Sequence, residues 1–298
     1  IAAFGGLTMR EFNEKVAALP EGVQFVRDGD SSRDQMMRML CFINYADFID
    51  RAKATCDFDN DDFRAVLEFV KSVPEKSLWD DPNFNSDTYD WEAYNNMYKE
   101  GKAIAEVSAL TDFFAFENMA YNFGTMETDI VGLPSKDRNG FAFSATQLKF
   151  LISAKSQFAD EGWKFVRSFF TDDVQNELSY GFPVTVSALN AAKQAALDKI
   201  AKRTAEQKDA TGEIVGYEIG DDGVSIPVYD QGKRYETAAD VEHIYDIVLS
   251  VKKQLGYDEN IYNVIMEEAS AYFSGEKSAE EVARLINNRV SIILTETR

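Results

Sequence analysis

The stretch from Phe58 to Val70 reads FDNDDFRAVLEFV, and the fold prediction starts from it. Apolar side chains recur in it at the i, i+3, i+4 and i+7 spacing of one helix face, held by Phe63, Val66, Leu67 and Val70. Asp61 and Asp62 stand before this face, where the positive end of a helix dipole favours acidic side chains. Because residues 55–59 have an extended pattern, the sequence predicts a short strand that runs directly into an amphipathic helix.

The same acidic residues also match part of a calcium-binding loop. Four of them take the first, third, fifth and twelfth positions of an EF-hand pattern, namely Asp57, Asp59, Asp61 and Glu68. That pattern needs glycine at its sixth position and an apolar residue at its eighth, where this chain has Asp62 and Arg64. We therefore favour the acid-capped helix and predict no metal site. The single histidine, His243, excludes zinc motifs that need two.

The composition is that of a folded, acidic protein. Hydrophobic residues make up 45% and aromatic residues 13% of the chain, more than disordered chains carry. The net charge of -20 argues against binding to nucleic acid or to anionic lipid. It suits a neutral or cationic ligand, or it serves only to keep the protein in solution. No apolar run approaches the length of a membrane span, so no direct membrane insertion is predicted. Cys41 lies in an apolar run and is predicted to be a buried free thiol.

Outward from this stretch, helices alternate with single short strands, which predicts a helix-rich α/β fold. Thr8 and Glu11 form a capping box before the first helix, and Ser278 and Glu281 form another before the last. Helices are expected from residue 31 or 32 to 48 and over 92–99, 112–121, 188–207, 237–254, 258–273 and 278–295. Another is marked by Trp163, Val166 and Phe170, and Trp163 is predicted to serve packing only. Extended segments are expected over 23–26, 103–110, 130–134 and 141–143, and a surface hairpin over 213–230.

No motif marks a catalytic site. The chain has no GxGxxG, GxSxG or P-loop pattern, and its S-x-x-K matches at Ser250 and Ser274 lack their partner motifs. Carboxylates are too numerous for an acid and base pair to be chosen from sequence. We therefore predict no catalytic residue and no cofactor.

A set of segments in fixed order carries one resemblance. In chain order they are Phe58–Phe63 with Leu67–Phe69, Glu100–Ile104, Val131–Lys136, Ala154–Ser156 with Glu161–Val166 and Gly181–Val184, and Tyr272–Glu281 with Ile286–Val290. Their order and spacing, over nearly the whole chain, resemble the family 1 extracellular solute-binding proteins of bacterial ATP-binding-cassette importers. That group includes the maltose-type binding proteins.

The resemblance implies a periplasmic-binding-protein type II fold, in which two α/β lobes joined by crossing strands close around a ligand. It also implies an incomplete first lobe, because the family's opening lobe, signal peptide and lipid-anchor cysteine have no counterpart here. Residues 1–135 would then form a second-lobe α/β segment, 136–235 a returning segment that contributes to the first lobe, and 236–298 the C-terminal helices. The hairpin near 213–230 is an insertion relative to the family pattern.

By the same resemblance, the protein is an extracellular solute-binding protein, lipid-anchored at the cell surface in its full-length form. It is expected to capture a carbohydrate-like ligand, an oligosaccharide, and to deliver it to the membrane permease of an importer. Closure of the cleft around the ligand is the hinge motion that the importer senses. Two alternatives stay open: a carbohydrate-active enzyme that uses paired carboxylates, and a non-catalytic interaction module at the cell surface.

Part of the candidate ligand site follows from the family. Asp112, Phe113 and Phe114 come after a predicted strand whose end faces the cleft in the resembling proteins. Since adjacent residues cannot share one helix face, one of the two phenylalanines is expected in the core and the other toward the ligand. Tyr245, with Glu242 before it, lies early in a late helix where maltose-type proteins place a stacking aromatic.

Other candidates rest on residue type and position. Sugar sites combine aromatic faces, which stack on the ring, with planar polar groups that bind hydroxyls. Trp79 and Trp91 flank an acidic loop and can stack on a ligand. Ser32 and Arg33 stand at a predicted helix start, where they either reach a sugar or only cap the helix.

Overall fold

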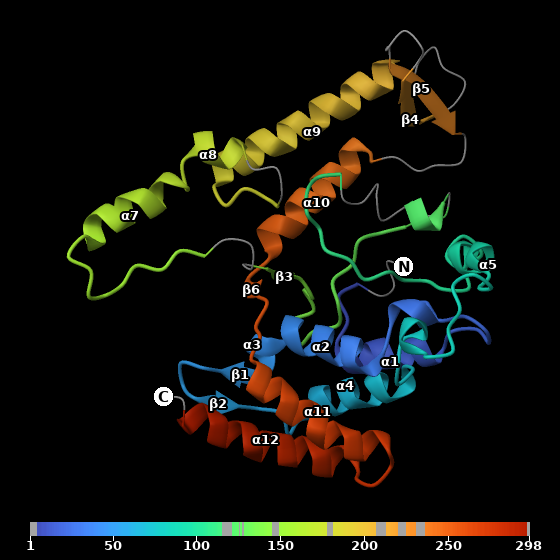
Figure 1. The fold of residues 1–298 in the computed structure, drawn as a ribbon, viewed down its shortest axis with the longest axis vertical. Coiled ribbons are helices and arrows are strands. Elements are labelled where there is room, and N and C mark those ends of the chain that lie inside the picture. Colours follow the sequence, from blue (N-terminus) through green and yellow to red (C-terminus); the bar gives the residue numbers. More distant parts are fainter. Residues whose placement is uncertain are drawn as a thin grey trace. The chain divides into compact units, whose positions relative to one another are not determined.

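The computed structural model describes residues 5–114, 121–124, 126, 128–144, 149–177, 181–206, 213–219, 225–230 and 236–296. The chain divides into two compact units: unit 1 contains 1–106, 129–145 and 250–298, and unit 2 contains 107–128 and 146–249. Helices dominate both units and the strands are few and short (Figure 1), which confirms the helix-rich part of the predicted fold class. The division at 135 and 235 concerns the lobes of the resembling family and stays a prediction.

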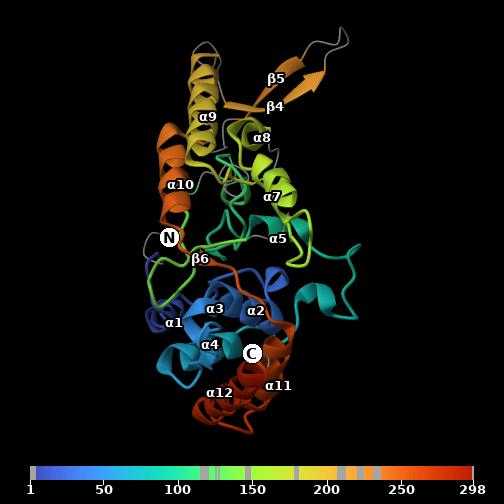
Figure 2. The same ribbon diagram turned by 90° about the vertical axis from the view of Figure 1, so that its left-hand side faces the viewer.

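Unit 1 is built around one helix, α4. Its elements are α1 (Met9–Ala17), η2 (Asp28–Asp30), α2 (Arg33–Ile43), α3 (Tyr45–Phe48), β1 (Ile49–Asp50), β2 (Thr55–Cys56), α4 (Asp61–Ser72), η3 (Leu78–Asp80), α5 (Trp91–Asn96), β3 (Ala142–Phe143), β6 (Lys253–Gln254), α11 (Glu259–Phe273) and α12 (Ala279–Glu296). Helices α1 and α2 contact α4 from one side and α11 and α12 from the other (Figures 1 and 2). Strand β1 pairs antiparallel with β2, and β3 pairs parallel with β6.

The apolar face predicted for α4 lies at the centre of this core. Phe63, Leu67 and Val70 are fully buried. The Phe58 ring stacks on Phe48 at 5.4 Å between centroids and meets Phe63 edge-on at 4.9 Å. Burying one such side chain contributes about 1.5–3 kcal/mol, so this face is a large part of what holds unit 1 together.

Helix α4 starts where predicted, with Asp61 and Asp62 in its first turn, but its capping side chain is that of Asn60 and not of an acid. The Asn60 side chain accepts a hydrogen bond from the Phe63 N–H at 2.9 Å, which caps the helix. Arg64 forms ion pairs with Asp59 and Asp61 at 2.9 and 2.7 Å. Two acids of the incomplete calcium pattern are therefore neutralised by the arginine that interrupts it.

Both predicted capping boxes are present. The Glu281 carboxylate accepts a hydrogen bond from the Ser278 N–H at 3.0 Å, and the Glu281 N–H donates to the Ser278 hydroxyl at 3.2 Å. Thr8 and Glu11 make the same exchange at the start of α1. The C-terminal helices α11 and α12 begin and end close to their predicted bounds.

The strand predictions are correct only in part: residues 142 and 143 form a short strand, residues 23–26 and 103–110 pair at a single bridge, and residues 130–134 form no strand. Residues 23–26 and 103–110 meet only at a parallel bridge between Gln24 and Ala103, extended by the Ala105 N–H, which donates to the Phe25 carbonyl at 2.8 Å. Residues 130–134 form no ladder in the described chain; the Leu133 N–H instead donates to the Gly140 carbonyl at 3.0 Å. Alternation of apolar residues favours a strand, but a ladder forms only where a partner lies alongside.

The helix predicted to run to residue 48 is interrupted at Asn44. Helix α2 ends at Ile43 and α3 begins at Tyr45. The Asn44 side-chain amide donates to the Pro134 carbonyl at 3.1 Å, and asparagine interrupts helices because its side chain competes for backbone partners. The predicted helix over 112–121 lies mostly outside the described residues, which resume at 121.

Unit 2 consists of η4 (Tyr121–Phe123), α7 (Ala159–Ser168), α8 (Asp172–Asn176), α9 (Val186–Glu206), β4 (Glu213–Ile219), β5 (Ser225–Asp230) and α10 (Ala238–Ser250). The antiparallel pairing of β4 with β5 confirms the predicted hairpin. Long helix α9 and helix α10 confirm two further predicted helices.

The packing role predicted for Trp163 is wrong. Trp163 lies in α7 as expected, but 54% of its surface is exposed, and no residue of α7 is buried. Amphipathic spacing shows which residues share a helix face; it does not show that anything covers that face.

Two findings concern single properties of the chain. In the described residues, no helix is both long enough and apolar enough to cross a membrane.

Cys41 is a buried free thiol as predicted, and burial raises the pKa of that thiol to about 12. Cys56 is also free and half-buried.

Replacing Ile286 by Ala is expected to destabilise the fold by about 2–5 kcal/mol, because this side chain is fully buried in α12 and its removal leaves a cavity. Ile292 lies on the same helix and is 57% exposed, so Ile292→Ala serves as the control, with an expected change within about 0.5 kcal/mol. Urea unfolding followed by far-UV circular dichroism measures both. Equal losses in the two variants would show that the buried face of α12 is misassigned.

Candidate functional site

The predicted site residues are divided between the two units. Unit 1 holds Ser32, Arg33, Trp79 and Trp91, and unit 2 holds Asp112, Phe113, Phe114, Glu242 and Tyr245. Within unit 1, the structure brings the two tryptophans into contact. Within unit 2, it brings Glu242 and Tyr245 to one side of α10.

Trp79 and Trp91 form a stacked pair. Their ring centroids lie 5.4 Å apart with an angle of 10° between the planes, and 38% and 42% of their surfaces are exposed. Phe84, Tyr89 and Tyr94 pack against the pair at steep angles, with centroid distances of 5.1 to 5.3 Å. We call these five residues the tryptophan platform. Edge-to-face contacts of this kind hold rings in defined orientations.

A close backbone contact positions Trp79. The Ser77 hydroxyl donates to the Gly29 carbonyl at 2.9 Å and accepts from the Trp79 N–H at 3.2 Å. The indole lies directly on Gly29, where a Cβ atom would be 2.4 Å from Trp79 Cζ2. Only glycine allows the ring to approach the backbone this closely.

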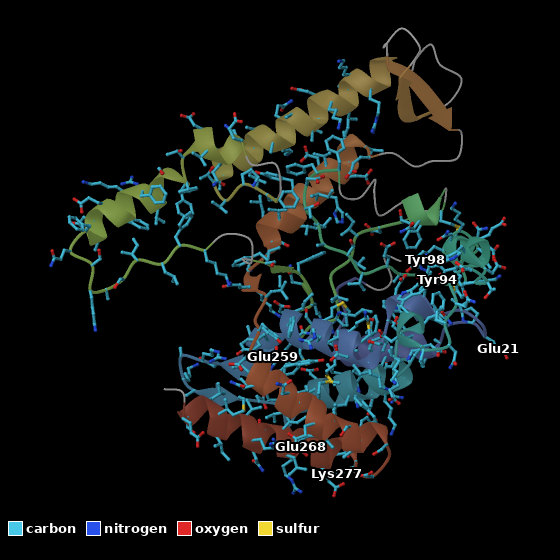
Figure 3. All side chains as sticks on the ribbon, viewed as in Figure 1. Glu21, Tyr94, Tyr98, Glu259, Glu268 and Lys277 are labelled. Atoms are coloured by element: carbon cyan, nitrogen blue, oxygen red, sulfur yellow. The ribbon has the colours of Figure 1, made fainter. Side chains whose placement is uncertain are left out.

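The buried side chain of Arg27 contacts Tyr94 of the platform and the neighbouring Tyr98. Arg27 is 8% exposed, and its Cζ atom lies 4.2 Å from the Tyr94 ring centroid and 4.3 Å from that of Tyr98. Arg27 Nε pairs with Asp30 at 2.7 Å, and the Tyr94 hydroxyl donates to Asp30 at 2.6 Å. Burial raises the pKa of both tyrosines, so the two hydroxyls stay protonated. Tyr94 lies in α5 and Tyr98 follows its end, and Figure 3 labels the two tyrosines next to each other.

The platform stands in a strongly acidic segment. Residues 75–92 contain one lysine, Lys76, and six acidic residues: Glu75, Asp80, Asp81, Asp87, Asp90 and Glu92. All six are exposed, and among the described residues none of them forms an ion pair. The Asp81 and Asp90 carboxylates accept hydrogen bonds from nearby backbone N–H groups. The surroundings of the tryptophans therefore carry exposed carboxylates that form no ion pair within the described part of the chain.

The predicted residues of α10 contact α9. Lys193 of α9 forms an ion pair with Glu242 at 2.5 Å, and its ammonium lies 4.2 Å from the Tyr245 ring centroid. The Tyr245 hydroxyl donates to Asn190 at 2.6 Å. These polar contacts join the two helices, and a ligand role for Glu242 and Tyr245 stays a prediction.

The two adjacent phenylalanines separate as their adjacency predicts. Phe113 is buried, with its ring 5.3 Å from that of Phe182, whereas Phe114 is half-buried, with the Lys199 ammonium 4.1 Å from its centroid. Asp112 accepts a hydrogen bond from the Phe114 N–H at 2.7 Å. Phe114 is thus the one of the pair that a ligand could contact.

Ser32 and Arg33 are engaged inside unit 1. The buried Ser32 hydroxyl accepts from the Gln35 N–H at 3.3 Å and caps α2. The Arg33 guanidinium donates to the Val73 and Lys71 carbonyls, both at 3.2 Å, at the end of α4. Ser32 thus caps the predicted helix, whereas Arg33 binds the end of α4; a ligand role for either stays a prediction.

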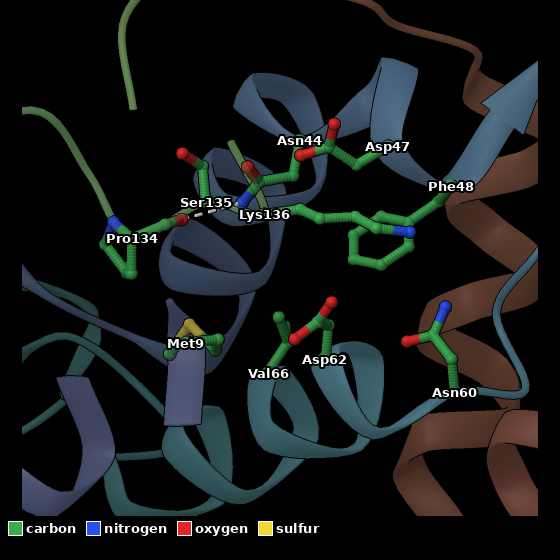
Figure 4. A pocket seen from close by; sticks show the side chains of 10 residues that line it. All are labelled: Met9, Asn44, Asp47, Phe48, Asn60, Asp62, Val66, Pro134, Ser135 and Lys136. Atoms are coloured by element: carbon green, nitrogen blue, oxygen red, sulfur yellow. Dashed lines mark hydrogen bonds between the residues drawn. The ribbon is translucent and has the colours of Figure 1, made fainter. Parts of the chain in front are cut away.

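Two small pockets in the described part of unit 1 each have room for about one water molecule and not for a sugar. One is lined by Asn44, Asp47, Asp62 and Lys136, among others (Figure 4), and has room for about one water molecule, about 10 Å³. Asn44 Oδ1 is buried there and has no hydrogen-bond partner among the described residues. In the part of the chain that the structure describes, no three His, Cys, Asp or Glu side chains gather as a metal ion would need. The open platform is therefore the better candidate for a ligand surface.

Sequence reasoning selected the two tryptophans and missed their supports. Tyr94 and Tyr98 lie four residues apart in a predicted helix, a spacing that places them on one face and was available as a signal. Gly29 and Ser77 gave no such signal, because their contact joins segments far apart in the sequence.

Comparison with known proteins adds no relative. No protein-family model matches the chain, and no curated protein matches its sequence.

Replacing Gly29 by Ala is expected to displace the Trp79 indole, because the added Cβ would overlap it. The variant is best made with Trp163→Phe, so that Trp79 and Trp91 are the only indoles left. Near-UV circular dichroism should then change in the tryptophan region. Gly162→Ala in the same background is the control, since its Cβ would meet nothing closer than 3.6 Å. An unchanged spectrum for Gly29→Ala would contradict the contact between Gly29 and Trp79.

Proposed function

We propose that this chain belongs to an extracellular, non-catalytic solute-binding protein that captures a carbohydrate-like ligand and delivers it to an ATP-binding-cassette importer. The ordered segments from residue 58 to residue 290 support this proposal by their resemblance to that family. The helix-rich architecture with short parallel pairings agrees with it. Anchoring at the cell surface and hand-over to a permease are parts of the same proposal.

The exposed tryptophan platform is the observation that carries the ligand part of the proposal. An aromatic side chain can bury about 150–250 Å² of surface, and each Å² of apolar surface removed from water is worth about 25 cal/mol. Trp79 and Trp91 leave part of that gain unused. Sugar rings present flat C–H faces that stack on indoles, so a saccharide is the ligand class that uses this surface best.

The rigidity of the platform favours binding. Trp79 is fixed by Gly29 and Ser77, and the Trp91 indole N–H donates to the Ser86 carbonyl at 2.9 Å. A surface whose side chains are already ordered loses less conformational entropy when a ligand arrives.

The platform is expected to bind neutral oligosaccharides, and Trp91→Ala should weaken that binding at least several-fold, because stacking on an aromatic ring contributes on the order of 1 kcal/mol beyond buried area. Tryptophan fluorescence titrations in the Trp163→Phe background measure it. Trp163 is then absent, and any change reports on the platform.

Phe165→Ala is the matched control, since it removes an exposed aromatic ring from α7 instead of the platform. It should leave the affinity unchanged, and thermal melts should show both variants folded. Binding that survives Trp91→Ala would remove the platform from the site. Release of reducing ends from the oligosaccharides would favour the enzyme alternative instead.

A further inference from the structure

We propose that the ligand of the tryptophan platform is a cationic oligosaccharide, one that carries protonated amino groups on its sugar rings. The inference deepens the proposed function and rests on it. A site for a neutral sugar needs only aromatic ring faces and hydrogen-bonding groups. The platform has, in addition, exposed carboxylates that form no ion pair among the described residues.

Acidic residues adjoin both tryptophans in the sequence. Asp80 follows Trp79 directly, and Asp90 and Glu92 flank Trp91 on either side. These three carboxylates are exposed and form no ion pair among the described residues. Each tryptophan thus has an acidic neighbour available to a ligand cation. The net charge of -20 adds a field that draws cations toward the whole chain.

Ring chemistry points to the same kind of ligand. The face of an indole is its electron-rich side, and tryptophan attracts cations more strongly than tyrosine or phenylalanine does. Trp79 and Trp91 both keep part of their surface open to solvent. An ammonium group near these faces would be attracted by the rings and by the carboxylates at the same time.

Arg27 shows the same combination inside the protein. Its Cζ atom lies 4.2 and 4.3 Å from the ring centroids of Tyr94 and Tyr98, and its Nε pairs with Asp30 at 2.7 Å. Tyr94 belongs to the platform, so a buried cation on aromatic faces beside a carboxylate already exists one ring away from the exposed pair. The exposed tryptophans with Asp80, Asp90 and Glu92 offer the same combination to a ligand.

An amino sugar satisfies both parts of this surface. Its C–H face stacks on an indole as that of any pyranose does, while its ammonium group meets the carboxylates. Acetylation of the amine removes the charge and leaves the ring unchanged. An acetylated and a free-amine oligosaccharide therefore differ in the one property that the inference concerns.

The test titrates the full chain carrying Trp163→Phe with three β-1,4-linked tetrasaccharides: glucosamine, N-acetylglucosamine and glucose. At low salt and about pH 6, where a sugar amine is charged, the glucosamine tetramer is expected to bind at least about tenfold more tightly than the others. Its advantage should shrink several-fold at high salt, because salt screens exposed charges. It should also vanish near pH 9, where the amines are neutral.

Charge-removing variants locate the effect. Asp80→Asn with Glu92→Gln should lower the affinity for the glucosamine tetramer by about threefold to tenfold and leave the neutral tetramers unaffected. Asp90 is left in place because its side chain caps α5. Asp160→Asn with Glu161→Gln removes the same charge from exposed positions of α7 and should change none of the affinities.

The outcomes separate this inference from the proposed function. Equal binding of all three tetrasaccharides would overturn the preference for a cation while leaving saccharide binding intact. The inference would also be overturned if the Asp80/Glu92 variant and the Asp160/Glu161 variant lost equal affinity for the glucosamine tetramer. The net charge of the protein, and not the carboxylates of the platform, would then account for the preference. If none of the three tetrasaccharides binds, both the inference and the assignment of the platform as the ligand surface are overturned.

Discussion

Burial of the apolar face of α4 is the interaction on which the rest of unit 1 depends. Helices α1, α2, α11 and α12 all pack against that one helix. Its carboxyl end is fixed by Arg33, which donates to the Lys71 and Val73 carbonyls, and by Lys71, whose ammonium donates to the Tyr272 carbonyl at 2.8 Å. The acidic segment with the tryptophan platform follows directly after Val73. The position of α4 in the core therefore fixes the start of the segment that carries the proposed ligand surface.

The helices were predictable because their signals are local. The period of α4, the capping box of α12 and the turn of the hairpin each lie within a few residues of sequence. The strands were not predictable in length, since the pairing of Gln24 with Ala103 depends on a partner far along the chain. Trp163 shows a second limit. Spacing identified its helix, but exposure depends on what packs against that helix, and no pattern within the helix contains that information.

The candidate site shows the same division. Sequence reasoning selected Trp79 and Trp91 by residue type and by the acidic loop between them, and the structure stacks them. Their supports come from elsewhere in the chain: Gly29 lies under Trp79, and Arg27 lies under Tyr94. Contacts between distant segments of this kind follow from the packing of the core, so a single sequence does not reveal them. A stacked indole pair fixed by glycine and by a buried arginine is the physical basis of the proposed function.

Fluorine NMR on the chain labelled with 5-fluorotryptophan tests the central claim most directly, because the three tryptophans give three separate signals. Single Trp→Phe variants assign each signal to its residue. On addition of the saccharide that binds, the signals of Trp79 and Trp91 are expected to shift together with one affinity, while that of Trp163 stays in place. A shift confined to Trp163, or saturable binding that moves none of the three signals, would contradict the platform as the ligand surface.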